Sequence, residues 1–318
     1  MSSTRQQTIA VKAHKVKLRR HMKLEPAARA ILENCLEQIR DNHAAIKTGT
    51  DPDCVRQMHV GLRRLDSALK IFDHSVSVPE KLQAELDYLS KKLGVARDWQ
   101  VFSCSTLVAI EATAPKEAQL SRLQQAALLI AAKKQKRIYT VLKNSRSERL
   151  MSVLFTWLEK SALIEIDKSL KNKHSNTKLV SFAQKVLFHQ HKNLLKRGKN
   201  LFKAEAGADP RTNHQCRIAI KNARYTCKFL ENLFDQKDIN VYINSLSTLQ
   251  DILGNINDGV VAGRLLQDID QGIAERQDNH TAAINFSLAY LLSQDQLQKQ
   301  KLRSTWKKFK DIHLPEPK

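Results

Sequence analysis

Two segments of the chain repeat apolar residues every three to four positions, the spacing that places them on one face of a helix. The apolar positions of the segment after Asp51 are Val55, Met58, Leu62, Leu65, Leu69 and Phe72. Those of the segment after Asp209 are Cys216, Ile220, Ala223, Cys227, Leu230 and Phe234. Each segment opens with an Asp-Pro pair. Since Asp favours the N-cap and Pro is tolerated in the first turn, the pattern predicts two amphipathic helices with defined starts.

The polar side of each predicted helix is basic. In the later helix the cations share one face, and we call them the second basic row: His214, Arg217, Lys221, Arg224 and Lys228. In the earlier helix the first basic row contains Arg56, His59, Arg63 and Lys70, with Arg64 next to it in the sequence. No acidic residue lies between His214 and Lys228. The second row therefore has no partner on its own helix to neutralise it.

The two segments correspond position by position. Asp51 and Asp209 are 158 residues apart, and the same offset relates Arg63 to Lys221. A second correspondence, offset by 160, relates LGVARDWQV from Leu93 to LGNINDGVV from Leu253. Matching segments at a nearly constant offset predict an internal duplication and an architecture with approximate two-fold symmetry.

The remaining pattern predicts further helices and no strands. Apolar residues recur at helical spacing through most of the chain, and no segment alternates apolar and polar residues as a half-buried strand does. The predicted fold class is therefore all-α. The helices expected outside the two basic segments are 25–47, 79–94, 101–112, 115–137, 147–163, 178–205, 240–254, 258–269, 280–292 and 295–310.

Two aspartates follow glycines that we expect to end helices. Gly94 and Gly254 suit the left-handed residue after a helix. Asp98 and Asp258 come shortly afterwards, so we interpret each as the N-cap of the next helix, in preference to a catalytic carboxylate.

The chain divides into four parts on this interpretation. Residues 1–23 form a basic arm that includes Arg20 and has no acid, and a charge run of this kind is usually a solvated tail. Residues 24–166 form the first helical half, 167–177 a polar linker, and 178–318 the second half.

Composition adds a strong positive charge to this picture. The 318 residues include 53 Lys plus Arg against 32 Asp plus Glu, a formal charge of +21. Such a charge opposes compaction unless a polyanion or counterions offset it. General solubility would also explain a net charge, but the clustering of cations on one face of two matched helices favours an anion-binding surface.

Other signals narrow the class of protein. The five cysteines form no CxxC pair, which indicates a reducing, cytoplasmic setting without disulfides or a zinc site. No apolar run approaches the roughly 18 residues of a membrane span, and the N-terminus lacks the features of a signal peptide. No histidine has a spacing typical of a metal ligand, and we expect no metal and no cofactor.

The repeated segments resemble the CHAD family, the conserved-histidine α-helical domain. Its signature is an Asp-Pro pair, a helix of the form His-x-x-Arg-(Val/Ile)-x-x-(Lys/Arg)-(Lys/Arg)-x-Arg, and an LGxx(R/N)D motif. The second copy matches through His214, Arg217, Ile218, Lys221 and Arg224, with Asn222 where a second basic residue is usual. The first copy exchanges the expected His and Arg, as Arg56 and His59, and has Asp66 in place of the final Arg.

The resemblance implies a pair of pseudo-symmetric helical bundles and a specific ligand. That ligand is inorganic polyphosphate, bound without catalysis in a basic groove between the two signature helices. It also suggests recruitment of the protein to polyphosphate granules, while the oligomeric state stays open. The residues we expect to bind polyphosphate are Arg56, His59, Arg63, Arg64, Lys70, His214, Arg217, Lys221, Arg224, Lys228, Arg20, Lys47, Lys196 and Arg197.

The residues alone support an extended polyphosphoryl anion. Cations one helical turn apart, about 5.4 Å, present a ladder of donors to a ligand with repeating charge. The main alternative is RNA or other nucleic acid, but aromatics are only 6% of the chain and no base-stacking platform is apparent. A second alternative is a polyphosphate-processing enzyme with His59 or His214 as phosphoryl acceptor or general acid. The chain has no Walker loop and no carboxylate-rich metal motif to support it. We expect the histidines to act as pH-sensitive phosphate donors instead.

Overall fold

The structure is a computed structural model of the chain, and it describes residues 9–49, 51–72, 76–115, 119–160, 179–203, 210–273 and 280–318. These residues are almost entirely helical, which confirms the all-α fold class. The elements of the first half are α1 (Leu24–Thr48), α2 (Pro52–Ile71), α3 (Glu80–Val101), the π-helix η1 (Phe102–Thr106), α4 (Leu107–Glu111), α5 (Leu120–Leu142) and α6 (Ser145–Lys160). Those of the second half are α8 (Leu179–Lys203), α9 (Pro210–Leu230), the 3₁₀ helix η3 (Glu231–Leu233), α10 (Gln236–Ile273) and α11 (Thr281–Lys310).

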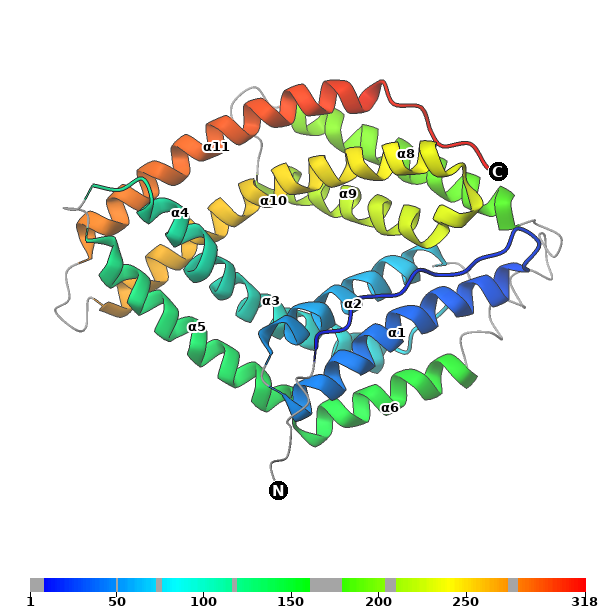
Figure 1. Ribbon diagram of the computed structural model, residues 1–318, viewed down its shortest axis with the longest axis horizontal. Coiled ribbons are helices and arrows are strands. Elements are labelled where there is room, and N and C mark those ends of the chain that lie inside the picture. Colours follow the sequence, from blue (N-terminus) through cyan, green and yellow to red (C-terminus); the bar gives the residue numbers. More distant parts are fainter. Residues whose placement is uncertain are drawn as a thin grey trace.

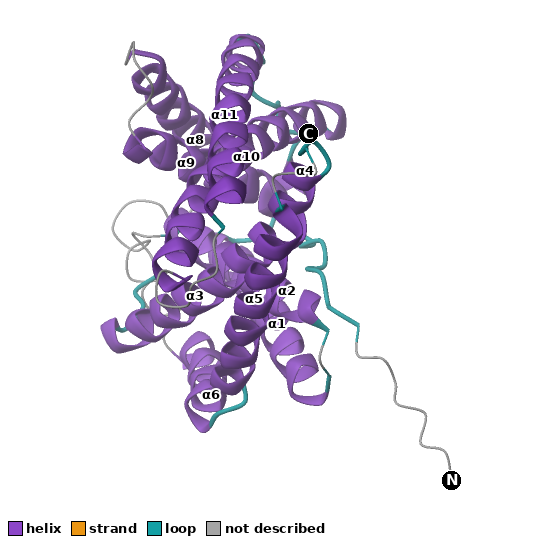
Figure 2. Ribbon diagram, turned by 90° about the vertical axis from the view of Figure 1, so that its left-hand side faces the viewer, coloured by secondary structure: helices purple, strands orange, loops and turns teal. Residues whose placement is uncertain are grey.

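The two halves lie against each other along the long axis of the molecule. Figure 1 shows α1, α2 and α6 on one side, α8, α9 and α10 on the other, and α2 and α3 facing α9 and α10 across the middle. At one end, α4 and α5 of the first half meet α10 and α11 of the second. Figure 2, turned by 90°, shows the same division into two stacked groups of helices.

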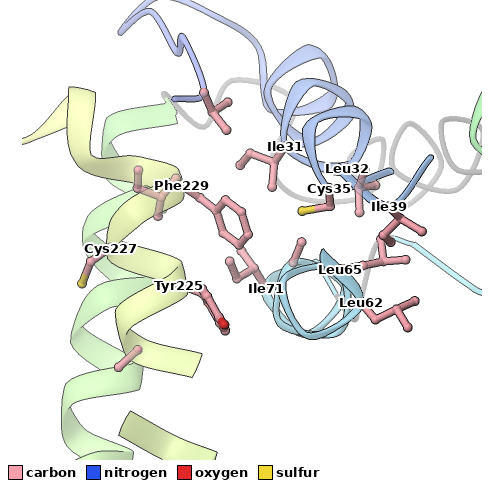
Figure 3. Close-up of a cluster of buried hydrophobic side chains, with 14 of the residues drawn as sticks. Ile31, Leu32, Cys35, Ile39, Leu62, Leu65, Ile71, Tyr225, Cys227 and Phe229 are labelled. Atoms are coloured by element: carbon pink, nitrogen blue, oxygen red, sulfur yellow. The ribbon is translucent and has the colours of Figure 1, made fainter. Parts of the chain in front are cut away.

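Apolar side chains join the halves at both ends of the molecule. At one end, Phe229 extends from α9 toward Ile31 of α1 and Ile71 of α2, while Cys227 on the same helix points away (Figure 3). At the other end a second core cluster unites Trp99, Phe102 and Leu123 with residues of α10 and α11. Burying a side chain such as Phe229 contributes about 1.5–3 kcal/mol. The interior between these two apolar regions is where polar groups from both halves meet.

The two basic segments form helices as predicted. In α2 the Asp51 side chain accepts a hydrogen bond from the Asp53 backbone N–H at 2.8 Å, and Pro52 occupies the first position. The corresponding Asp209 lies outside the described residues, and α9 starts at Pro210. Gly61 brings α2 against α1, because a Cβ there would lie 2.8 Å from Cγ1 of Ile39.

The predicted breaks after Gly94 and Gly254 are wrong. α3 continues through Gly94 and Asp98 into η1 and α4, and α10 runs without interruption from Gln236 to Ile273. Asp98 and Asp258 therefore lie within helices and are not N-caps. A glycine inside a helix costs only about 1 kcal/mol, which the burial of the flanking apolar residues easily exceeds. The two helices expected over 280–292 and 295–310 also form one helix, α11.

The basic arm is also different from the expectation of a solvated tail. Its described part runs antiparallel along α1, where Asn42 donates to the Val11 carbonyl at 2.7 Å and Asn34 to the His14 carbonyl at 3.2 Å. Val16 and Leu18 are buried in the main core. Buried apolar residues at alternate positions hold the strand-like arm down despite its charge. The predicted linker, 167–177, lies outside the described residues.

No described helix is long and apolar enough to cross a membrane. The internal duplication stays a prediction from the sequence, although α1–α2 and α8–α9 each form a pair of neighbouring helices before a long third helix.

Candidate anion-binding groove

The interior between the apolar ends is formed by α2 and α3 of the first half and α9 and α10 of the second. Ser67 on α2 donates a hydrogen bond to the Asn222 side chain on α9 at 2.9 Å, which fixes the two signature helices directly against each other. Asn222 stands where a second basic residue is usual in the repeated motif. The bond to Ser67 gives a physical reason for that departure, because an amide oxygen accepts from a hydroxyl and a cation cannot.

Four cations from both halves gather in this interior, and we call them the central cluster: Arg63 of α2, Arg97 of α3, and Arg217 and Lys221 of α9. Burial, together with Arg63 and Arg217, lowers the pKa of Lys221 to about 7. Burial, and then the charge of Arg63, also lowers the pKa of Arg217. The pKa of Arg97 is lowered first by burial and next by Arg56. The charge of Arg63 thus opposes the charged forms of the other three cations of the cluster.

The central cluster lacks close counterions. Within the part of the chain that the structure describes, no carboxylate oxygen lies within 4.0 Å of a nitrogen of Arg63, Arg217 or Lys221. The Nε of Arg217 is buried and finds no hydrogen-bond partner among the described residues. A buried donor without a partner costs about 1–3 kcal/mol, so the free protein is less stable here than it would be with an anion present.

A small pocket of about 250 Å³ with mixed polar and apolar lining lies between α2, α3 and α9. Arg63, Lys70 and Lys221 line it, together with Asp66 and Asp87. Both aspartates belong to the first half, and Lys70 donates to Asp66 at 2.7 Å. This pocket is where cations of the two predicted basic rows meet.

A larger cavity of about 580 Å³ adjoins the cluster on its other side, between η1, α9, α10 and α11. Arg217 and His214 lie in its wall, and the remaining lining is mostly apolar. His214 is exposed, and burial, with Arg217 and Lys221, lowers its pKa. The histidine is therefore mostly neutral at pH 7 and can donate one hydrogen bond without carrying charge.

Two aspartates within helices lie near the cluster. Asp98 of α3 and Asp258 of α10 each have a pKa raised mainly by burial. Asp98 forms a long ion pair of 3.8 Å with Arg264 of α10, which connects the halves. Arg63 and Arg217 act on both aspartates in the opposite sense, lowering their pKa values. The two carboxylates are thus distant, partial counterions of the cluster.

Three predicted binding residues are neutralised by acids on or next to their own helix. Arg56 pairs with Asp53, and its Nη2 lies 3.1 Å from Oδ2. Lys70 pairs with Asp66, and Lys228 with Glu231 at 3.3 Å, which also binds Lys15. The exposed pairs of Arg56 and Lys70 are worth at most about 1 kcal/mol and can be displaced, whereas Glu231 is buried. These residues are secondary candidates.

Two more predicted binding residues, Arg64 and His59, are buried in the helix packing. Arg64 is buried and donates to Gln38 at 2.8 Å and to Asn34 at 2.6 Å, with its guanidinium 5.2 Å from the Phe229 ring centre. It connects α1, α2 and α9, so its contribution is structural.

His59 is 5% exposed, and its Cε1 would lie 3.8 Å from a Cβ at Gly94. Burial and then Arg63 lower its pKa to about 3, so it stays neutral and is not the pH-sensitive donor that its position in the row predicted.

The other predicted cations line neither pocket. Arg224 donates to Gln250 of α10 at 2.8 Å, and Lys47 pairs with Glu148 of α6 at 2.6 Å. Arg197 donates to Gln215 at 2.5 Å. Arg20 and Lys196 are exposed on the arm and on α8.

Sequence reasoning missed Arg97, Asp98, Asp258 and Arg264 as groove residues. The first three belong to the LGVARD and LGNIND motifs, so their repetition was the available signal. The N-cap interpretation assigned both aspartates to helix starts and so removed them from consideration. Among the described residues there is no cluster of three or more potential metal ligands.

The sequence and the fold of the chain are similar to those of known proteins. Residues 30–267 match the CHAD domain. The crystal structure of the CHAD domain from the plant Ricinus communis has a TM-score of 0.82 at 33% identity, covering 98% of this chain and 99% of that one. PptA from Streptomyces chartreusis has a TM-score of 0.68 and covers 90% of this chain and 100% of its own, but at 12% identity it supports the fold alone. No curated protein matches the chain.

Proposed function

The chain belongs to the CHAD domain family, and from that membership we propose that it binds inorganic polyphosphate, without cleaving it, in the groove around the central cluster. The ligand contacts that we assign are Arg217 and His214 in the larger cavity and Arg63, Lys221 and Lys70 in the smaller pocket.

One observation carries this proposal: cations from both halves are held together, partly buried, without counterions within ion-pair distance. The pKa of about 7 at Lys221 expresses the cost, because burial and two neighbouring guanidinium groups oppose its charge. A polyanion in the groove would remove that repulsion and provide acceptors for the unpaired Nε of Arg217. Arginine can bind phosphate oxygens in a bidentate manner and lysine adds a point charge, so the set suits a chain of phosphates.

The aromatic side chains of the signature helices support polyphosphate over RNA. Phe72 is 2% exposed, Phe229 1% and Tyr225 7%, so none is available to stack on a base. Recognition of single-stranded nucleic acid without sequence preference normally relies on such stacking in addition to charge. A ligand of phosphates alone needs only the cations.

The buried state of His59 argues for binding without chemistry. A phosphoryl acceptor must reach the ligand, whereas His59 is enclosed between α2 and α3 with a pKa of about 3. His214 is reachable, but no carboxylate among the described residues lies within hydrogen-bond distance of it to orient or activate it. We therefore assign the groove a holding role, which would recruit the protein to polyphosphate granules in the cytoplasm.

The test compares polyphosphate with single-stranded RNA of equal charge at the same salt concentration, using fluorescence anisotropy. We expect polyphosphate to bind at least about tenfold more tightly to the wild type. The double variant R217A/K221A should lose most of that affinity. The matched control K196A/K199A removes the same charge from the exposed face of α8 and should keep it.

Three results would overturn the proposal. Equal affinities for polyphosphate and RNA would indicate a general polyanion surface. Equal losses in R217A/K221A and K196A/K199A would indicate that net charge, and not the groove, binds the ligand. Shortening of the polyphosphate during incubation with a divalent metal ion would contradict the holding role.

A further inference from the structure

The 580 Å³ cavity has features that polyphosphate would not use. Its walls include Leu253, Leu288 and Leu291, and the exposed side chains of Val260 and Leu292 lie at its rim, 58% and 69% exposed. Its volume is in the usual range for small-molecule sites, which combine apolar walls with a few polar groups. Inorganic polyphosphate has no apolar part to cover these walls.

One wall of the cavity is formed by a π-helix. The wall from the first half contains η1, a π-helix in which the Leu107 backbone N–H bonds to the Phe102 carbonyl. Ser105 and Thr106 of this segment line the cavity. π-helical turns are rare and occur frequently at functional sites, because the extra residue widens the helix and redirects its side chains.

Glycines of α10 form the opposite wall. A Cβ at Gly259 would lie 4.0 Å from Cδ2 of Leu291, and one at Gly263 would lie 4.0 Å from Cδ2 of Leu288. A Cβ at either position would therefore fit without a clash, in van der Waals contact with a leucine of α11. Because both glycines and both leucines line the cavity, a larger side chain there would take up cavity space.

The charges of the lining restrict the ligand. Lys299 is paired with Asp295 at 2.6 Å, and Asp258 is the other acid in the wall. Among the described lining residues, Arg217 is the cation without a carboxylate within 4.0 Å, and its Nε is an unpaired buried donor. Asn255, Gln294 and Gln298 add amide groups that can bond to the edge of a ring. This set suits one anionic group and a flat apolar body.

We propose that this cavity binds a small organic phosphate, an aromatic or heteroaromatic phosphomonoester. Its ring lies between α10 and α11, and its phosphate contacts His214 and Arg217. Asp258 accepts a hydrogen bond from a ligand hydroxyl or amine. Since the phosphate position is shared with the groove at Arg217, inorganic polyphosphate competes with this ligand, although the apolar part of the cavity is independent of polyphosphate binding.

The first test uses 1-naphthyl phosphate as the probe on the full chain, with 1-naphthol and inorganic phosphate as its two separate halves. Isothermal titration should show the ester binding at least about tenfold more tightly than either half. Equal binding of naphthol and naphthyl phosphate would overturn the phosphate assignment. Equal binding of inorganic phosphate and naphthyl phosphate would overturn the apolar assignment.

The second test uses glycines of the same helix as matched positions. Gly263→Phe should weaken naphthyl phosphate at least about tenfold because the ring occupies the cavity. Gly254 is not in the cavity lining, and a Cβ there meets nothing within 4 Å. Gly254→Phe should therefore change the affinity for naphthyl phosphate by less than about twofold. Gly259→Leu fills the same space with a smaller side chain, should the phenylalanine prevent folding.

Measuring polyphosphate affinity in the same variants distinguishes a failure of this inference from a failure of the proposed function. Gly263→Phe should retain polyphosphate affinity, because the variant leaves Arg63, Arg217 and Lys221 in place. Unchanged naphthyl phosphate binding in Gly263→Phe and Gly259→Leu would place the probe elsewhere and refute the inference. Failure of the wild type to bind polyphosphate would refute the proposed function alone.

Discussion

Replacing Lys221 by methionine should stabilise the unliganded protein and weaken polyphosphate binding at the same time. Burial, Arg63 and Arg217 lower the pKa of this lysine from 10.5 to about 7. Methionine keeps an unbranched side chain of similar length but removes the charge. Lys221 would then oppose folding and support binding, which is the behaviour expected of a cation positioned to bind an anion.

The magnitude follows from the pKa difference. Each unit of pKa corresponds to about 1.36 kcal/mol, so charging Lys221 in the folded state at pH 7 costs up to about 4 kcal/mol relative to the unfolded chain. Lys221 is only partly buried, and its remaining contact with water reduces this cost. We expect the free energy of unfolding of K221M to rise by about 1–3 kcal/mol, with an increase in Tm of about 2–4 °C for each kcal/mol.

The dependence on pH has a definite sign. Between about pH 7 and 10.5 the unfolded chain holds the Lys221 proton and the folded protein has lost it. The unfolded state therefore binds more protons, and the stability of the wild type rises with pH across this window. Below pH 7 the full cost is present. Bound phosphate should restore the proton, so polyphosphate affinity should fall as the pH rises above 7, and K221M should lack both effects.

Urea denaturation at pH 7 and pH 9, with isothermal titration of polyphosphate, measures both quantities. The matched control is K196M, which removes one exposed lysine of α8 and should change stability by less than about 0.5 kcal/mol. The reasoning is wrong if K221M is less stable than the wild type at pH 7, or if it binds polyphosphate with unchanged affinity.

Four further substitutions have predicted effects. Asp258→Asn removes a carboxylate from beside the arginines of the groove. It should tighten polyphosphate binding about threefold to tenfold in a competition titration. Weaker binding would mean that Asp258 positions those arginines. Arg64→Ala leaves two buried amide oxygens without donors, so it should lower the free energy of unfolding, measured in urea, by about 2–4 kcal/mol. Polyphosphate affinity should stay unchanged, because this side chain is buried in the helix packing. Gly198→Ala would place a Cβ 1.8 Å from Cζ2 of Trp306 and should lower the free energy of unfolding by about 1–3 kcal/mol. Gly254→Ala places its Cβ in open space and should raise the free energy of unfolding by about 0.5–1 kcal/mol. The opposite order of their Tm values would contradict this packing.

The fold was predictable from the sequence as far as local signals extend. The period of apolar residues and the Asp-Pro starts located α2 and α9, because those signals lie within each helix. The ends of α3 and α10 were not predictable in this way. Gly94 and Gly254 look like helix ends, but burial of residues on both sides keeps the helices continuous, and that burial depends on partners far away in the sequence.

The groove was predictable in part for the same reason. The spacing of Arg63, Arg217 and Lys221 along their helices identified them as members of basic rows. Helical spacing does not say which neighbour covers a given face, so Arg64 and His59 could not be separated from the groove residues before their contacts with α1 and α3 were known. The pairing of Lys70 with Asp66, four residues away, was readable from the sequence alone.

Arg97 shows what the rows could not reveal. It lies on a third helix, outside both signature segments, and it reaches the cluster only because α3 stays helical beyond Gly94. The repeated LGVARD motif marked Arg97 in the sequence, but its position beside the basic rows depends on the length of α3.

The salt dependence of polyphosphate affinity tests the central claim most directly, measured for the wild type and for R217A/K221A. Each cation that neutralises a phosphate of a single-stranded polyanion contributes about 0.7 to the slope of log affinity against log salt. If the groove binds the ligand, the slope of the double variant should be smaller than that of the wild type by about one to two. An unchanged slope, with polyphosphate still bound, would mean that the ligand is held by other cations and would contradict the account.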